Sequence, residues 1–256
     1  LPELVLESDP AGKEGVRGDD EMLGRPGLGQ FPFDPRQVRE STDTIGDGFG
    51  EIDEEDMGAF DVLLDPAGAA NLGVAMAAAG AAIIDVGGES TRPTATTVWE
   101  EDEKARVIPV IERLVAAGVA VSADTRKASV MAAALSAGAH IINDVSALLF
   151  DDRALGVVLQ SQAPVVLMHY PGRPDDPHGR DSYSDPLIEV YDWLEDRIAA
   201  VEAKGVARSR IIADPGIGFG KMSVAHNLAI VNGLALYQCL GVPVLLRASQ
   251  ARAGSE

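Results

Sequence analysis

Polar side chains recur where short apolar runs of the sequence end. Ligand sites of parallel α/β folds form at the carboxyl edge of the sheet, so side chains placed there are expected to line one pocket. Carboxylates and amides suit a flat, nitrogen-rich heterocycle, because a carboxylate accepts two N–H bonds while Asn both donates and accepts. Any single Asp at a strand end is equally well explained as a helix N-cap, and only the recurrence favours a pocket. The residues are Asp85, Asp124, Asn143 with its neighbour Asp144, His169 and Asp214.

Two glycine-rich loops follow two of these runs. The first is GGESTRP, residues 87–93, in which Arg92 is suited to an anionic group and the loop to a lid; an exposed surface arginine is the alternative. The second is DPGIGFGK, residues 214–221. Its glycines allow the backbone to approach a ligand closely, and Phe219 can stack on an aromatic ring.

Histidine and cysteine give little sign of metal or redox chemistry. The four histidines show no metal-ligand spacing, so no metal ligand is identified and His169 is expected to be structural. Cys239 is the single cysteine, which rules out an intrachain disulfide and fits a reducing cytoplasm.

Alternating apolar patterns predict the elements that position these residues. Amphipathic or Ala-rich helices alternate with short buried strands, which indicates βαβ units and a parallel sheet. Repetition alone leaves open whether the sheet is an open one or a (β/α)8 barrel, which needs eight strands. The predicted strands are residues 82–86, 119–124, 140–145, 164–169, 210–214 and 242–246, with a weak candidate near 57–64. The predicted helices are residues 66–80, 98–117, 127–137, 152–162, 186–204 and 223–240.

Length and charge narrow the class of protein. The 256 residues suffice for one large α/β domain, and the net charge of −19 disfavours nucleic acid and anionic membrane surfaces as partners. No apolar run is long enough to span a membrane. Residues 1–62 hold 17 of the 40 acidic residues and no sustained apolar period, so we expect a poorly ordered, acidic Gly/Pro-rich leader before a domain at 63–256.

From residue 63 to 246 the sequence resembles dihydropteroate synthase, the pterin-binding barrel enzyme of folate biosynthesis. The matching stretches occur in family order, and the pairing of GGESTRP with DPGIGFGK is the most specific. They are residues 83–93, 122–127, 141–146, 165–169 and 214–221. The resemblance implies a TIM-type (β/α)8 barrel, often a homodimer, which usually requires Mg²⁺. It also implies condensation of 6-hydroxymethyl-7,8-dihydropterin pyrophosphate with 4-aminobenzoate to give 7,8-dihydropteroate and pyrophosphate.

The resemblance also assigns roles to residues. Asp124, Asn143 and Asp214 would hold the pterin edge, and the carboxylates of Asp124 and Asp214 would act in catalysis by stabilising a pterin cation. Met168 would pack against the pterin ring and Phe219 would flank the aminobenzoate. The mobile loop over the substrates would contribute Thr91 and Arg92.

Both ends of the sequence depart from the family pattern. No loop like Asn-Val-Thr-Pro-Asp-Ser-Phe precedes Leu64, so the usual Asn ligand of the metal is not found. Ser249-Gln250-Ala251 stands where the family has Ser-Arg-Lys, and a last strand is not found, so the barrel is expected to be incomplete. Two alternatives to an active synthase stay open: an inactive or fragmentary relative that at most binds pterin, and a pterin-dependent methyltransferase barrel.

Overall fold

Five short parallel strands form the centre of the protein in a computed structural model, which describes residues 65–90, 97–170, 182–221 and 223–246. They follow one another in the sheet in chain order. Each stands at the end of a predicted apolar run, so five of the six predicted strands are confirmed. The strands are β1 (Ile84–Gly87), β2 (Val121–Asp124), β3 (Ile141–Asp144), β4 (Val165–Met168) and β5 (Ile211–Asp214).

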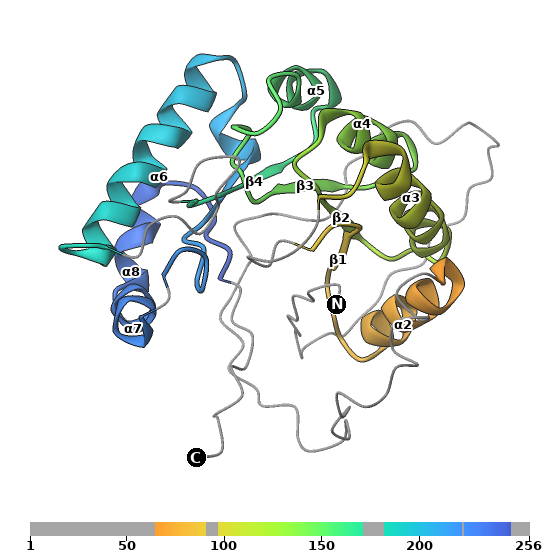
Figure 1. Ribbon diagram of the computed structural model, residues 1–256, viewed down its shortest axis with the longest axis horizontal. Coiled ribbons are helices and arrows are strands. Elements are labelled where there is room, and N and C mark those ends of the chain that lie inside the picture. Colours follow the sequence, from red (N-terminus) through yellow and green to blue (C-terminus); the bar gives the residue numbers. More distant parts are fainter. Residues whose placement is uncertain (1–64, 91–96, 171–181, 222, 247–256) are drawn as a thin grey trace, which may run out of the picture.

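Helices connect the strands and cover the outer face of the curved sheet (Figure 1). This right-handed βαβ arrangement is what alternating helices and parallel strands require. Two of the helices begin at an Asp-Pro pair, where the Asp side chain accepts hydrogen bonds from the first free N–H groups and the proline needs none. The helices are α2 (Pro66–Ala78), α3 (Glu100–Ala116), α4 (Ala128–Ser136), α5 (Ala154–Ser161) and α6 (Pro186–Ala203).

The last predicted helix, residues 223–240, is divided into three pieces. α7 (Val224–Asn232) ends at Gly233, and α8 (Leu234–Tyr237) and a 3-10 turn (Gln238–Leu240) follow. A Cβ on Gly233 would lie 2.4 Å from the side chain of Leu187, so this glycine lets α6 approach closely. The apolar period alone did not reveal that break.

The sixth predicted strand is reduced to one parallel bridge between Ala213 and Val244. Ala213 N donates to Pro243 O at 2.9 Å, and Leu245 N donates to Ala213 O at 2.8 Å. Within the described residues the barrel is therefore partial, five strands and one bridge. The weak first strand near 57–64, the leader at 1–62 and the end at 247–256 lie outside those residues.

Side chains that alternate along the strands build two apolar layers. The outward-facing ones join the helices in one large core that includes Ile84, Leu114, Ile142, Leu167 and Ile211. The inward-facing ones form a small cluster of Ile141, Val166 and Ile212, with Ile83 and Leu245 packed against it. No helix of the described part is both long and apolar enough to cross a bilayer.

Candidate functional site

Strand register brings the predicted site residues to one edge and one face of the sheet. Asp124 at the end of β2 is the register partner of Asn143 on β3. Met168 at the end of β4 is the partner of Asp214 on β5. Partners in adjacent parallel strands project to the same face, so these four side chains share the inner face at the carboxyl edge.

The inner apolar cluster forms a floor beneath them. Ile141, Val166 and Ile212 lie two positions before Asn143, Met168 and Asp214, hence on the same face one layer deeper. Asn143, Met168 and Asp214 are themselves almost fully buried. Such a site, apolar below and polar above, suits a flat ring with hydrogen-bonding edges.

Asp85 on β1 completes this polar layer. Its carboxylate accepts a 2.9 Å hydrogen bond from Asn143 Nδ2, and it is buried. The sequence marked Asp85 as a polar strand end but assigned it no role. Gly87, two residues later, is the register partner of Asp124, and a Cβ there would be in van der Waals contact with Asp124 Cβ at 3.4 Å.

Asn143 offers an acceptor to a ligand. Its Oδ1 is buried and has no hydrogen-bond partner among the described residues, whereas its Nδ2 is fixed by Asp85. A buried acceptor without a donor is costly, by about 1–3 kcal/mol, so such atoms usually mark a place where a ligand or water binds. An N–H group of a bound heterocycle would satisfy it.

Asp144, which the sequence grouped with Asn143, faces the opposite side of the sheet. Its carboxylate accepts hydrogen bonds from the backbone and hydroxyl of Ser146 and from Leu148 N. Burial raises the pKa of Asp144 to about 6, although these hydrogen bonds and the nearby positive charge of Arg197 act to lower it. The expectation that it lines the pocket is therefore wrong, because adjacent residues of a strand point to opposite faces.

The Asp144 carboxylate stabilises an unusual turn. Ala147 and Leu148 both have left-handed backbone angles, φ 51° and 62°, which are uncommon outside glycine. Arg197 from α6 donates to both of their carbonyl groups, at 2.7 and 3.2 Å. The turn that follows β3 is thus held by the Asp144 carboxylate and by the Arg197 guanidinium.

The DPGIGFGK loop is folded back on itself by its own polar groups. Asp214 Oδ1 accepts from Gly216 N at 2.7 Å, and Lys221 Nζ donates to Gly216 O at 2.8 Å and Phe219 O at 3.0 Å. Phe219 is held against a cluster that includes Met168. Burial lowers the pKa of Lys221 to about 7. No role was assigned to Lys221 from the sequence, and only its place in the motif could have drawn attention to it.

His169 is buried beside this loop and packs edge-on against Trp193, with 5.0 Å between ring centroids. Burial, together with the charge of Lys221, lowers the pKa of His169 to about 2, so the ring is neutral at physiological pH. These contacts agree with the structural role expected from the sequence. Thr91 and Arg92 lie outside the described residues.

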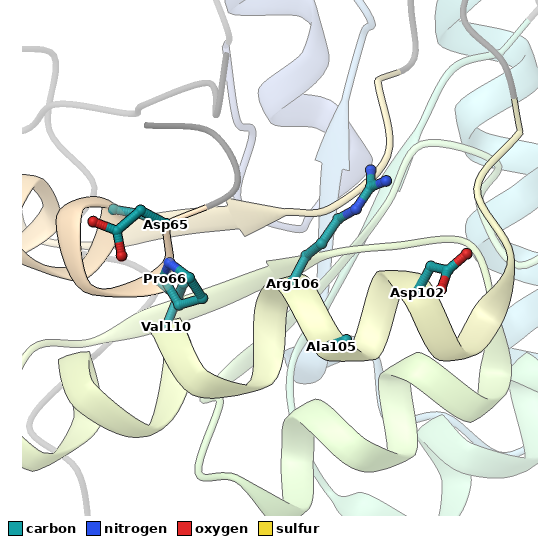
Figure 2. A pocket seen from close by; sticks show the side chains of 7 residues that line it. Asp65, Pro66, Asp102, Ala105, Arg106 and Val110 are labelled. Atoms are coloured by element: carbon teal, nitrogen blue, oxygen red, sulfur yellow. The ribbon is translucent and has the colours of Figure 1, made fainter. Parts of the chain in front are cut away.

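A separate hollow of about 290 Å³ lies between the start of α2 and α3 (Figure 2). Arg106 crosses its side and donates to Gly88 O at 3.0 Å. None of the predicted site residues lines it, so it is not the ligand site. Its lining consists of Asp65, Pro66, Ala69, Asp102, Ala105, Arg106 and Val110.

A metal ion held by protein side chains alone needs several donor side chains close together. In residues 65–90, 97–170, 182–221 and 223–246, no three His, Cys, Asp or Glu side chains are grouped as a metal ion would need. The described residues therefore offer no cage of protein side chains alone, whereas Mg²⁺ is usually held by one or two carboxylates together with water and substrate phosphates.

Comparison with known proteins identifies the family. The family model described as pterin binding enzyme matches residues 57–256. Dihydropteroate synthase of Escherichia coli K12 is 40% identical over 196 residues, which cover 76% of this chain and 68% of the relative. The chain belongs to the dihydropteroate synthase family. The partial barrel described above is accordingly part of the family's TIM-type fold.

Other dihydropteroate synthases show how much of the family protein is present. The Bacillus subtilis 168 enzyme is 47% identical over 68% of this chain, and the chain spans 58% of that relative's length. A structure of the Xanthomonas albilineans synthase with 4-aminobenzoic acid has a TM-score of 0.65 and 48% identity, covering 70% of this chain and 63% of that one. Another, in complex with 7,8-dihydropteroate, has a TM-score of 0.61 and 44% identity over 70% and 64%.

Proposed function

We propose that this chain carries the pterin site of a dihydropteroate synthase and takes part in the condensation of 6-hydroxymethyl-7,8-dihydropterin pyrophosphate with 4-aminobenzoate. The products are 7,8-dihydropteroate and pyrophosphate. The observation that carries the proposal is the register that aligns Asp124 with Asn143 and Met168 with Asp214 above an apolar floor. Related structures with 4-aminobenzoic acid and with 7,8-dihydropteroate support the choice of ligands.

The pterin is held by the polar layer. Asp124, Asn143 and Asp214 hydrogen-bond the edge of the bicyclic ring, and Asn143 Oδ1 accepts from one of its N–H groups. Met168 packs against the ring face, which its burial in the same layer supports.

The second substrate, 4-aminobenzoate, contacts the two glycine-rich loops. Phe219, held beside Met168, flanks the ring of 4-aminobenzoate. Thr91 and Arg92 contact the substrates from the GGESTRP loop, and Arg92 offsets negative charge. These two assignments rest on the family motif.

The carboxylates act on charge that develops during the reaction. The C–O bond between the pterin methylene carbon and pyrophosphate breaks, and the amine nitrogen of 4-aminobenzoate then bonds to that carbon and loses a proton. The pterin is cationic between these events, and the fixed carboxylates of Asp124 and Asp214 stabilise it.

A second candidate function is pterin binding without turnover. Gln250 and Ala251, which stand where the family has Arg and Lys, favour it. Both candidate functions use the same pterin site, and they differ only in whether the pyrophosphate is released.

The test is an assay of the purified chain with dihydropterin pyrophosphate, labelled 4-aminobenzoate and Mg²⁺, next to a calorimetric titration with 7,8-dihydropteroate. Dihydropteroate formation supports the synthase, and heat without turnover supports the binding role. The absence of both refutes the proposal, and cobalamin-dependent methyl transfer would replace it with a methyltransferase. A cytoplasmic homodimer is the family assembly that we propose, to be checked by sedimentation.

A further inference from the structure

A buried cluster of four charges joins the segment after β1 to the segment after β2. Lys127 forms ion pairs with both Glu89 and Glu103, and these three side chains are only 5, 8 and 1% exposed. Arg126 contributes the second cation: its guanidinium lies 2.7 Å from Glu89 Oε1 and stacks over the ring of Phe150 at 4.0 Å. Two cations and two carboxylates balance, the condition under which buried charges are tolerated.

The Glu89 carboxylate ties the start of the GGESTRP loop to a residue beyond its end. Its Oε2 accepts a 2.8 Å hydrogen bond from Val98 N, nine positions further along the chain. Residues 89 and 98 are thereby held together on either side of Thr91 and Arg92. Burial tends to raise the pKa of Glu89, but hydrogen bonds from Lys127 and Val98 and the adjacent positive charges hold it below its usual range. Glu89 is therefore ionised at neutral pH.

The same cluster reaches the segment that follows Asp124. Glu103 on α3 binds Lys127 through one oxygen and accepts the Thr125 hydroxyl at 2.6 Å through the other. Thr125, the residue next to Asp124, donates its N–H to Asn143 O at 3.0 Å. The cluster thus contacts Thr125, which is the neighbour in sequence of Asp124 in the polar layer.

Close packing leaves this arrangement little freedom. A Cβ on Gly88 would lie 2.8 Å from Val107 and 3.0 Å from Glu103 Cγ, so the start of the loop is pressed against α3. Only a residue without a side chain fits there, and the loop consequently leaves β1 in a fixed direction.

A gain in the stability of the fold does not by itself explain why these charges are buried. A buried ion pair is often no better than an apolar pair of similar volume, because desolvation offsets the attraction between the charges. What ions add is direction, since the two carboxylates here, one after β1 and one on α3, bind donors from two further segments, Val98 N and the side chains of residues 125–127. The charges instead determine where the loop and Asp124 lie relative to each other.

We propose that Lys127, Glu89 and Glu103 are positioning residues that hold the ends of the GGESTRP loop beside Asp124. The inference rests on the proposed function for its ligand, because Asp124, next to Thr125, is the described binding residue that the cluster places. The cluster touches neither reacting atom, so its effect passes through the residues that it holds.

The experiment compares variants for backbone protection and ligand affinity. Glu89→Gln keeps the shape and removes the charge. The double variant Lys127→Met with Glu103→Leu replaces the ion pair by apolar side chains, which protects against simple unfolding. Glu202→Gln is the control, because Glu202 lies on α6, its side chain is 43% exposed, and it forms an ion pair with Arg208. Circular dichroism is used to choose a temperature at which all variants are folded.

The amide of Val98 is expected to exchange hydrogen at least about tenfold faster in both cluster variants, because its acceptor is weakened or released. Calorimetry is expected to give about tenfold weaker binding of 7,8-dihydropteroate, which a purely stabilising role would leave unchanged in folded protein. The control should match the wild type in both measurements.

Wild-type exchange at Val98 in the folded double variant would overturn the proposal, and so would unchanged affinity in a chain that binds the ligand. If the wild type itself fails to bind 7,8-dihydropteroate, the proposed function fails, and the exchange comparison alone still decides whether the cluster fixes the loop.

Discussion

Asn143 and Asp85 meet across an intervening strand. The amide of Asn143 on β3 donates a 2.9 Å hydrogen bond to the carboxylate of Asp85 on β1, although β2 lies between them in the sheet. The bond runs diagonally across β2, because Asp85 is the register partner of Ser122 and Asn143 is the register partner of Asp124. This bond orients Asn143 so that its other atom, Oδ1, stays available to a ligand.

Replacing Asp85 with Ala should therefore misorient Asn143. The free energy of unfolding is expected to fall by about 1–3 kcal/mol, because a buried amide loses its acceptor. Affinity for 7,8-dihydropteroate, measured by calorimetry, should fall about tenfold. Asp192→Ala on the exposed side of α6 is the matched control. Equal affinity of Asp85→Ala and wild type would show that Asp85 does not orient the site.

The raised pKa of Asp144 predicts a pH dependence of stability. Its native pKa is about 6 against an ordinary 3.8, so the folded protein holds this proton more tightly than the unfolded chain. The Asp144 contribution is therefore fully favourable below about pH 4 and is lost as the pH rises to 6, by about 3 kcal/mol in all. Urea unfolding at pH 4–7 should show this decline in wild type and much less of it in Asp144→Asn. Parallel pH profiles would contradict the assignment.

Lys221 should affect the 4-aminobenzoate site through the loop that it ties. Lys221→Met removes the donor to Gly216 O and Phe219 O, so Phe219 is no longer fixed beside Met168. Calorimetric affinity for 4-aminobenzoate is expected to fall about tenfold, the value of one hydrogen bond near 1.4 kcal/mol. Lys204→Met changes an exposed lysine at the end of α6 and should leave affinity unchanged. Identical affinities in the two variants would exclude this role.

Two glycines of the same loop give a matched pair for the role of close packing. Gly216 and Gly218 both have positive φ, 67° and 81°. A Cβ on Gly216 would lie 2.5 Å from His169 O, whereas nothing lies within 4 Å of one on Gly218. Thermal or urea unfolding should give a loss of about 1 kcal/mol for Gly218→Ala, from backbone strain alone. Gly216→Ala adds a backbone clash and should lose about 3 kcal/mol. Equal losses would contradict the close approach.

The amino-acid sequence by itself determined the local elements and the family. Apolar runs predicted the positions of β1 to β5, and Ala-rich or amphipathic stretches predicted α2 and α6, because strand and helix periods depend on neighbours a few residues apart. The ordered motifs predicted the family, and the strand ends predicted that Asp124, Asn143 and Asp214 would share an edge. Met168 was assigned to the site by the family resemblance alone. The roles of these four residues in binding stay predictions.

Only the tertiary structure decided how these residues are held. The bond from Asn143 to Asp85, the outward direction of Asp144 and the cluster of Lys127 with Glu89 and Glu103 all join residues distant in sequence or depend on which strand face is buried. Such contacts follow from strand register and helix packing, which no short window of the sequence contains. Local periodicity therefore gives the elements, whereas the site forms only when five strands and their helices assemble.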